Sequence, residues 1–210
     1  MMKKIISILL CIMFLLGSSA TVFAEPVINY KTAIEPYLAI MDKLNLEYGL
    51  EGDSRIRLAE GADQNFYLEV QNMSLKEYEQ NLRKTYEQVR LIPDEIRMEP
   101  KRVQFIEPSQ GVTPQGLVYP VTIEATQSDD PFIQIWVRNM IEDNSWGKVF
   151  LYNISAGSDP HPSKLYFDAI SYTYNFPVSW ACEVDYKGYM RQGSVIYPSF
   201  KYVYQAFYIF

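Results

Sequence analysis

The sequence predicts an α+β protein, in which a short N-terminal helical part precedes a C-terminal antiparallel β-sandwich of about seven strands. Before residue 100 the apolar residues recur every three or four positions, and after it they recur every second position. All three Trp and 11 of the 17 Tyr lie in residues 101–210, and aromatic side chains are enriched in strands. We therefore expect a helical region over 25–100 and a β-sandwich domain over 101–210.

Residues 1–24 have the pattern of a secretory signal peptide. The positively charged start, MMKK, precedes an apolar run over 5–16, and Val22 and Ala24 occupy the small-residue positions before a cleavage site. We expect cleavage after Ala24 and secretion of the remaining chain to the extracellular space. An uncleaved anchor is the alternative, but the apolar run is shorter than a membrane-spanning helix requires.

The composition excludes several classes of partner. The full chain has a formal net charge of −6, and loss of Lys3 and Lys4 with the leader changes this charge to −8. An acidic chain repels phosphate backbones and anionic lipids, so we expect no nucleic-acid binding and no membrane contact after cleavage. Cys182 is then the single remaining cysteine, which rules out an internal disulfide and requires the core to hold the fold.

The first predicted helix covers residues 31–46. Its apolar residues are spaced by three and four positions, as on one face of a helix. Pro36 lies near the start, where a missing N–H is tolerated, and Gly49 is a stop signal. Residues 51–64 are polar and indicate a loop.

The second predicted helix has the clearest boundaries in the sequence. Ser74 and Glu77 match the Ser-x-x-Glu pattern of a capping box, and apolar residues then follow at steps of three, four or seven. Pro93 ends the run because a proline disfavours helical conformation in the residue before it. The charged residues lie on the other faces, which is typical of a solvated helix surface.

Turn-forming segments separate the strands of the second part at intervals of about ten residues, which is typical of an antiparallel sandwich. The expected strands are 102–107, 117–126, 132–140, 148–155, 164–176, 179–186 and 201–210.

The last strand, KYVYQAFYIF, is apolar on both faces. Val203, Phe207 and Ile209 project to one side. The opposite side carries Tyr202, Tyr204, Tyr208 and Phe210. We expect a terminal strand paired within a sheet, with the tyrosine side packed under helices or half open to water. The alternative is a surface that binds a partner.

No nucleophilic or redox site is predicted. His161 is the only histidine, and no Gly-x-Ser-x-Gly elbow accompanies it. Cys182 alternates with Trp180 and Val184 on a face expected to point inward, where a thiol acts as a small apolar group. We predict no catalytic residue, no metal ligand set and no cofactor.

Acidic residues occur in turns and on strands. Asp129-Asp130 and Glu142-Asp143 lie between strands and offer oxygen ligands for Ca²⁺, but adjacent acids in turns are mostly turn formers. A hydrolase would need two carboxylates that face each other across a cleft. The acids on predicted strands are Glu124, Asp168, Glu183 and Asp185.

The aromatic residues are the most suggestive group. Trp136 is out of phase with the apolar residues beside it, Trp146 precedes a glycine in a turn, and Tyr152 lies on a strand. Rings exposed on a sandwich stack on sugars or on a protein partner. We therefore predict that Trp136, Trp146 and Tyr152 bind a ligand, either a cell-wall glycan or a protein.

The segments MDKLNLEYGL (41–50) and MSLKEYEQNLRK (73–84) resemble a pattern found in uncharacterised secreted proteins of Gram-positive bacteria. The similarity covers roughly residues 34–90, implies secretion and transfers no site residue. Together these features predict a secreted, non-catalytic extracellular binding protein. The alternatives are a secreted hydrolase that uses strand carboxylates and a secreted inhibitor or immunity-type protein.

Overall fold

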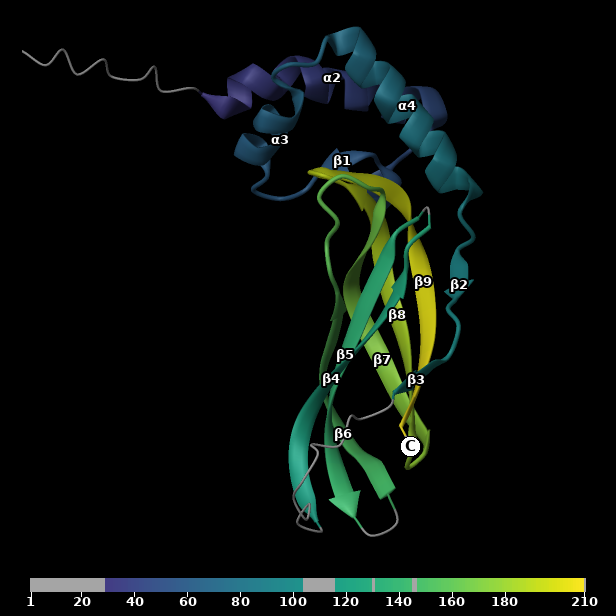
Figure 1. Cartoon of the computed structure of the whole chain (residues 1–210). Coiled ribbons are helices and arrows are strands. Elements are labelled where there is room, and N and C mark those ends of the chain that lie inside the picture. Colours follow the sequence, from purple (N-terminus) through teal and green to yellow (C-terminus); the bar gives the residue numbers. More distant parts are fainter. Residues whose placement is uncertain (1–28, 104–115, 130, 145–146, 210) are drawn as a thin grey trace, which may run out of the picture.

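The computed structural model describes residues 29–103, 116–129, 131–144 and 147–209. The predicted signal peptide with its cleavage site lies outside these residues, as do Trp146, Asp130 and Phe210. The described part is an α+β fold with a β-sandwich after the helices, as predicted (Figure 1). The helices are α2 (Tyr30–Tyr48), α3 (Asp63–Val70) and α4 (Leu75–Leu91), with a short 3₁₀ turn, η1 (Gly52–Ser54).

Strands occupy most of the remaining described chain. The short ones are β1 (Arg57–Leu58), β2 (Glu95–Arg97) and β3 (Lys101–Val103). The long ones are β4 (Leu117–Gln127), β5 (Ile133–Asn144), β6 (Gly147–Ser158), β7 (Tyr166–Val178), β8 (Ala181–Gln192) and β9 (Val195–Ile209).

Local capping interactions set the ends of the two long helices. The Asn29 side chain accepts a hydrogen bond from Thr32 N at 3.5 Å, and α2 ends at Gly49, which has a left-handed φ of 65°. The Ser74 hydroxyl oxygen accepts from Glu77 N at 3.2 Å at the start of α4. Both predicted helices are therefore confirmed.

The predicted loop over 51–64 is wrong in part. It contains η1, β1 and the first residues of α3. Two hydrogen bonds between the Asn45 side chain and the main chain of Ile56, at 2.7 and 2.9 Å, hold this segment against α2. Helix α3 has no side-chain cap and only eight residues, of which Phe66 and Val70 are buried. Tertiary contacts stabilise it, because a helix this short is not stable by itself.

The strands form two facing sheets. The larger sheet has the order β1-β9-β8-β7, and the smaller has the order β4-β5-β6. All pairings between long strands are antiparallel, but β2 and β3 run parallel to β9 and occupy the same edge as β1. Strand β9 therefore has neighbours on both edges.

Strands β8 and β9 are longer than the sequence pattern predicts. The expected end of one strand at 186 and the expected start of the next at 201 are both wrong, because β8 continues to Gln192 and a tight turn at Gly193, with φ 54°, leads into β9. Opposite this region β9 contains a bulge, where Ser199 has φ 73° and the register with β8 shifts. The bulge bends β9, so that its first residues reach β1 below the helices (Figure 1).

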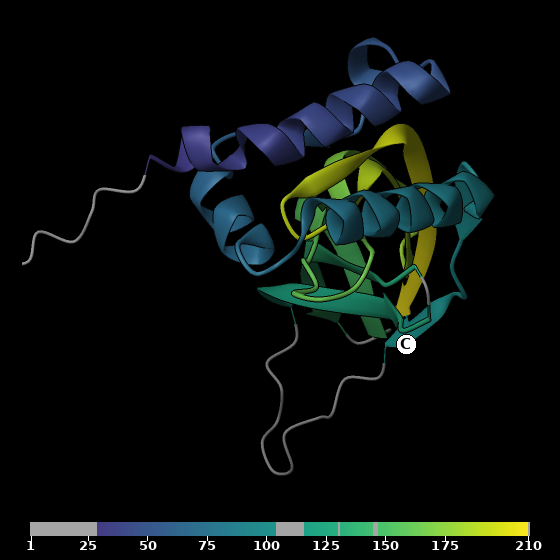
Figure 2. The same ribbon diagram turned by 90° about the horizontal axis from the view of Figure 1, so that it is seen from above.

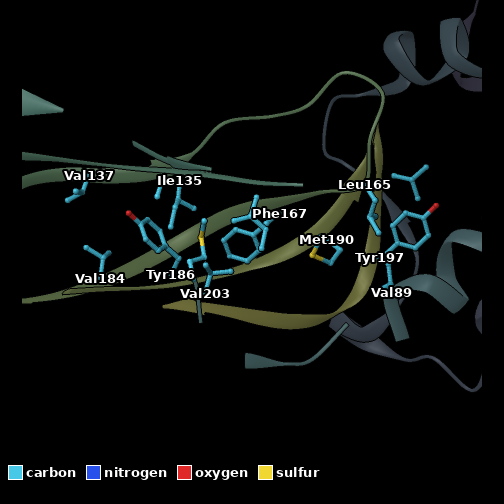
Figure 3. Packing of buried hydrophobic residues seen from close by; sticks show 14 of the residues in the cluster. Val89, Ile135, Val137, Leu165, Phe167, Val184, Tyr186, Met190, Tyr197 and Val203 are labelled. Atoms are coloured by element: carbon cyan, nitrogen blue, oxygen red, sulfur yellow. The ribbon is translucent and has the colours of Figure 1, made fainter. Parts of the chain in front are cut away.

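The three helices cover one end of the sandwich, and α2 and α4 lie side by side across it (Figures 1 and 2). One continuous cluster of buried residues extends from the helices into the space between the sheets. Figure 3 shows part of it, from Val89 on α4 past Tyr197 and Met190 to Tyr186 and Val137. None of the helices in the described residues is both long and apolar enough to span a membrane.

Candidate functional site

Strand β9 places two tyrosines on the outer face of the larger sheet. Val203, Phe207 and Ile209 are fully buried, whereas Tyr202 is 45% exposed and Tyr204 is half-buried. The prediction that residues 201–210 form a paired strand with a half-open tyrosine side is confirmed for the described residues. The outer face of β9 is therefore rigid and partly aromatic.

The strand register aligns a row of side chains across Tyr202. Tyr202 pairs with Glu95 on β2 at one edge and with Lys187 on β8 at the other, and Lys187 pairs in turn with Ser171 on β7. Directly paired residues project from the same face, and neighbouring strands lie about 4.8 Å apart. An acid, a phenol, an ammonium group and a hydroxyl thus follow one another across the sheet.

A second row crosses Tyr204 about 7 Å further along the strands, which is the rise of two residues. Tyr204 pairs with Arg97 on β2 and with Asp185 on β8, and Asp185 pairs with Thr173 on β7. The order of charges is reversed relative to the first row. Each tyrosine therefore lies between a cation and an anion, and opposite charges also lie next to each other along β2 and along β8, so that like charges are diagonal.

Together these rows line a groove with a volume of about 440 Å³. We call it the tyrosine groove, and its outward-facing residues are Glu95, Arg97, Ser171, Thr173, Asp185, Lys187, Tyr202 and Tyr204. Its size lies within the range of sites for small molecules.

Ring contacts hold the cations of the groove in place. The Arg97 guanidinium carbon lies 5.1 Å from the centroid of the Tyr204 ring, and the Lys187 ammonium lies 3.9 Å from that of Phe200. Burial, together with a side-chain hydrogen bond with Glu183, raises the pKa of Tyr204 to about 12. The phenol is therefore neutral at physiological pH, and its hydroxyl donates to Glu183.

More rings extend the outer face along β9. At one end of the groove, Tyr189 and Phe200 have ring centroids 4.5 Å apart. At the other end, Trp180 and Tyr208 have centroids 5.7 Å apart. Eight residues separate Phe200 from Tyr208, or about 27 Å of extended strand. The groove therefore lies between two ring pairs, of which Tyr189 is buried and Trp180 is exposed.

The structure places the predicted binding residues on the other sheet. Trp136 is half-buried on the outer face of β5, where its ring covers Gly157: a Cβ atom there would lie 2.8 Å from Trp136 Cζ2. Tyr152 is exposed, and its pairing with Met140 puts it on the same outer face. Trp146 lies outside the described residues. Neither Trp136 nor Tyr152 lines the tyrosine groove, and their binding role stays a prediction.

The two residues considered as nucleophile and base lie apart from the groove. His161 Nδ1 accepts hydrogen bonds from Ser163 N and Lys164 N, so the imidazole stabilises a turn. Cys182 is fully buried, as expected, and this burial raises its pKa to about 11. Its thiol is protonated at neutral pH and inaccessible, which makes it a poor nucleophile.

The carboxylates considered for metal or hydrolase sites are mostly dispersed. Asp143 pairs with Lys148 at 2.9 Å and Asp168 pairs with Arg191 at 3.0 Å. No group of three metal-ligating side chains occurs in the part of the chain that the structure describes. Of the strand acids, Asp185 lines the tyrosine groove, where it is joined by Glu95.

Sequence reasoning placed Tyr202 and Tyr204 on one side of the last strand, but it did not select them as binding residues and missed the residues around them. The alternation of β9 gives the outward direction of Tyr202 and Tyr204, whereas the pairing with β2 and β8 has no local signal. Comparison with known proteins adds no further residue, because no family model, no curated protein and no solved structure matches the chain.

Proposed function

We propose that the protein is a secreted, non-catalytic binding protein that holds a carbohydrate chain, such as a cell-wall glycan, in the tyrosine groove. The observation that carries this proposal is the placement of Tyr202 and Tyr204 between alternating charged groups on an open sheet face. A sugar ring has an apolar face that stacks on aromatic rings and a rim of hydroxyls that bond to polar groups.

The polar groups of the groove match the needs of sugar hydroxyls. Each hydroxyl both donates and accepts, so a binding face with donors and acceptors in alternation serves it well. Arg97 and Lys187 donate, whereas Glu95 and Asp185 accept. Hydrogen bonds to charged groups are stronger than bonds between neutral groups, which favours retention in competition with water.

Rigidity of the groove supports the same function. Strand β9 is paired along both edges, and its inward side chains are buried in the core. A ligand therefore meets side chains that are already ordered, and less conformational entropy is lost on binding. The signal-peptide pattern of residues 1–24 supports delivery of this face to the cell exterior.

A cell-wall pull-down tests this proposal. Purified residues 25–210 are mixed with washed Gram-positive cell walls, alongside a Tyr202→Ala/Tyr204→Ala variant. We expect the variant to bind at least about tenfold more weakly, because it loses both stacking rings. Tyr174→Ala is the matched control, since Tyr174 is 49% exposed on β7 outside the groove.

Three outcomes are distinguishable. Wall binding that survives the double substitution contradicts the tyrosine groove, and a Trp136→Ala/Tyr152→Ala variant then tests the other sheet. Retention on secreted proteins in place of walls would indicate an inhibitor or immunity-type protein. Absence of binding to either material removes the proposal.

A glycoside hydrolase is the second candidate function, because Glu95 and Asp185 line the same groove. Paired carboxylates on either side of a bound sugar are the usual catalytic groups of such enzymes. The test is release of reducing ends from cell-wall glycans. If this activity disappears in both Glu95→Gln and Asp185→Asn while wall binding is retained, the protein is a hydrolase and the proposal of a non-catalytic binding protein is wrong.

A further inference from the structure

One wall of the tyrosine groove is formed by a very short strand. Strand β2 has three residues, of which Glu95 and Arg97 line the groove, and it lies beside β9 at the edge of the larger sheet (Figure 1). Parallel pairing is less stable per residue than antiparallel pairing, and three residues form few ladder hydrogen bonds. After its last residue, the Gln205 side-chain amide donates to Glu99 O at 3.0 Å. The start of β2 needs an anchor of its own.

A buried lysine of β9 contacts the chain just before β2. The side chain of Lys201 is 4% exposed, and its ammonium donates to the main-chain oxygen of Ile92 and to Asp94 Oδ1, both at 2.8 Å. A buried ammonium group is unfavourable unless it is hydrogen-bonded, so these two acceptors fix its position. Since Lys201 directly precedes Tyr202, one strand carries both a ring of the groove and the group that holds the β2 wall.

The contact between Lys201 and Ile92 also sets the direction in which the chain leaves α4. Ile92 is the C-terminal cap of this helix. The last carbonyl groups of a helix have no partners within it, and the helix dipole favours a cation beside them. Pro93 follows with a fixed φ, so the orientation of the Ile92 carbonyl limits where Asp94 lies.

Main-chain hydrogen bonds connect this anchor to the tyrosines of the groove. Tyr202 N donates to Asp94 O at 2.7 Å, before the first residue of β2. Met98 N donates to Tyr204 O at 3.0 Å, after its last residue. The position of Asp94 therefore determines how β2 is aligned with the part of β9 that carries both rings.

We propose that Lys201 is a positioning residue of the tyrosine groove. Its ammonium fixes the start of β2 and thereby places Glu95 and Arg97 beside Tyr202 and Tyr204. Lys201 does not itself line the groove, so it acts through β2. The importance of Glu95 and Arg97 for a ligand rests on the proposed function, whereas their placement by Lys201 is measurable without one.

NMR spectroscopy of purified residues 25–210 tests this placement. The Arg97 guanidinium carbon lies 5.1 Å from the centroid of the Tyr204 ring, so the ring current shifts the Arg97 side-chain signals. Lys201→Met removes the ammonium and keeps a side chain of similar length. We expect the Arg97 signals to move toward those of a fully exposed arginine. The amide protons of Tyr202 and Met98 should exchange with solvent at least about tenfold faster, because β2 opens locally.

Two control variants separate positioning from a general loss of stability. Lys43→Met removes a lysine that pairs with Glu79 at the surface, and it should change neither the Arg97 signals nor the exchange rates. Glu69→Ala breaks a contact between α3 and the turn before β9, and it should leave the Arg97 signals in place even though it destabilises the fold.

A milder substitution keeps the test decisive if Lys201→Met does not fold. Asp94→Ala removes one of the two acceptors of the ammonium, and the Asp94 side chain is 77% exposed, so this variant leaves the core intact. It should move the Arg97 signals in the same direction by a smaller amount.

The cell-wall pull-down connects the placement to binding. Lys201→Met should bind walls about tenfold more weakly than the wild type, because the charged groups of β2 no longer meet the ligand in register. Lys43→Met should bind like the wild type. If the wild type itself binds no cell wall, the carbohydrate proposal fails, and the NMR signals alone decide the role of Lys201.

Three results overturn the role of Lys201. The first is a Lys201→Met variant, or an Asp94→Ala variant in its place, with unchanged Arg97 signals and unchanged amide exchange. The second is the same set of changes in Glu69→Ala, which would mean that they report stability alone. The third is full wall binding by a Lys201→Met variant whose Arg97 signals have moved, which would show that the β2 wall is not part of the site.

Discussion

Glu69 on α3 accepts two hydrogen bonds from Ser194, one from the main-chain N–H and one from the hydroxyl, and so joins a two-turn helix to the turn between β8 and β9. A side chain at the neighbouring Gly193 would displace this carboxylate, because a Cβ atom there would lie 2.7 Å from Glu69 Oε2. The helical part and the larger sheet are therefore connected by a polar contact in addition to the shared core.

Replacement of Glu69 tests this connection. Glu69→Ala should lower the free energy of unfolding by about 1–3 kcal/mol, because the buried Ser194 loses the acceptor for its N–H and hydroxyl. Urea denaturation measures the change. Glu60→Ala removes an exposed acid before α3 and should change stability by less than about 0.5 kcal/mol. Equal effects of the two substitutions would show that the contact contributes nothing.

One of the hydrogen bonds between the two sheets can be removed by deleting a single oxygen atom. The hydroxyl of the buried Tyr186 on β8 donates to the main-chain oxygen of Trp136 on β5 at 2.9 Å. Tyr186→Phe should lower the free energy of unfolding by about 1 kcal/mol, because it leaves that carbonyl without its donor. Thermal and urea unfolding check this value, and unchanged stability would contradict it.

Tyr78 on α4 differs from Tyr186 in the hydrogen bonding of its hydroxyl. Its hydroxyl is buried and has no hydrogen-bond partner among the described residues. Tyr78→Phe should leave stability unchanged or raise it by up to about 1 kcal/mol, since an unpaired buried polar group is unfavourable. A loss as large as that of Tyr186→Phe would mean that the hydroxyl has a partner in solution.

Burial of Cys182 predicts a loss of stability at alkaline pH. The pKa of this thiol rises from its ordinary value of 9.0 to about 11 in the folded protein. Between these values the unfolded chain releases a proton that the folded chain retains, so the free energy of unfolding falls as pH rises above 9.0. The slope for one such group is at most about 1.4 kcal/mol per pH unit.

Unfolding curves at several alkaline pH values measure this slope. Cys182→Ala should show a shallower decline just above pH 9, whatever its absolute stability, because the thiol no longer titrates. A thiol reagent should label the wild type only after unfolding. Rapid labelling of the folded protein, or equal slopes in the two proteins, would contradict the burial of the thiol.

Local signals were sufficient to predict the long helices. Ser74 and Glu77 are three residues apart, and Asn45 to Gly49 close the last turn of α2 within the same segment. Such interactions form between neighbours in the chain, and for that reason their pattern is readable in the sequence. Alternation in the second part predicted the β-sandwich and the paired final strand for the same reason.

Short elements were missed because their stability comes from elsewhere in the molecule. Strand β1 forms by pairing with the start of β9, and α3 is held by Phe66 in the core and by Glu69 on Ser194. The length of β8 was also underestimated, since Gly193 makes a turn so tight that the polar residues before it remain in the strand.

The sequence by itself determined that Tyr202 and Tyr204 lie on one side of the last strand, opposite Val203 and Phe207, because side chains alternate along a strand. Only the tertiary structure decided which groups surround them. The short parallel strand β2 brings Glu95 and Arg97 to one edge of β9, and β8 brings Asp185 and Lys187 to the other. Strand register depends on how distant segments pack their buried faces together. The alternation of side chains along one strand does not identify the strand that pairs with it.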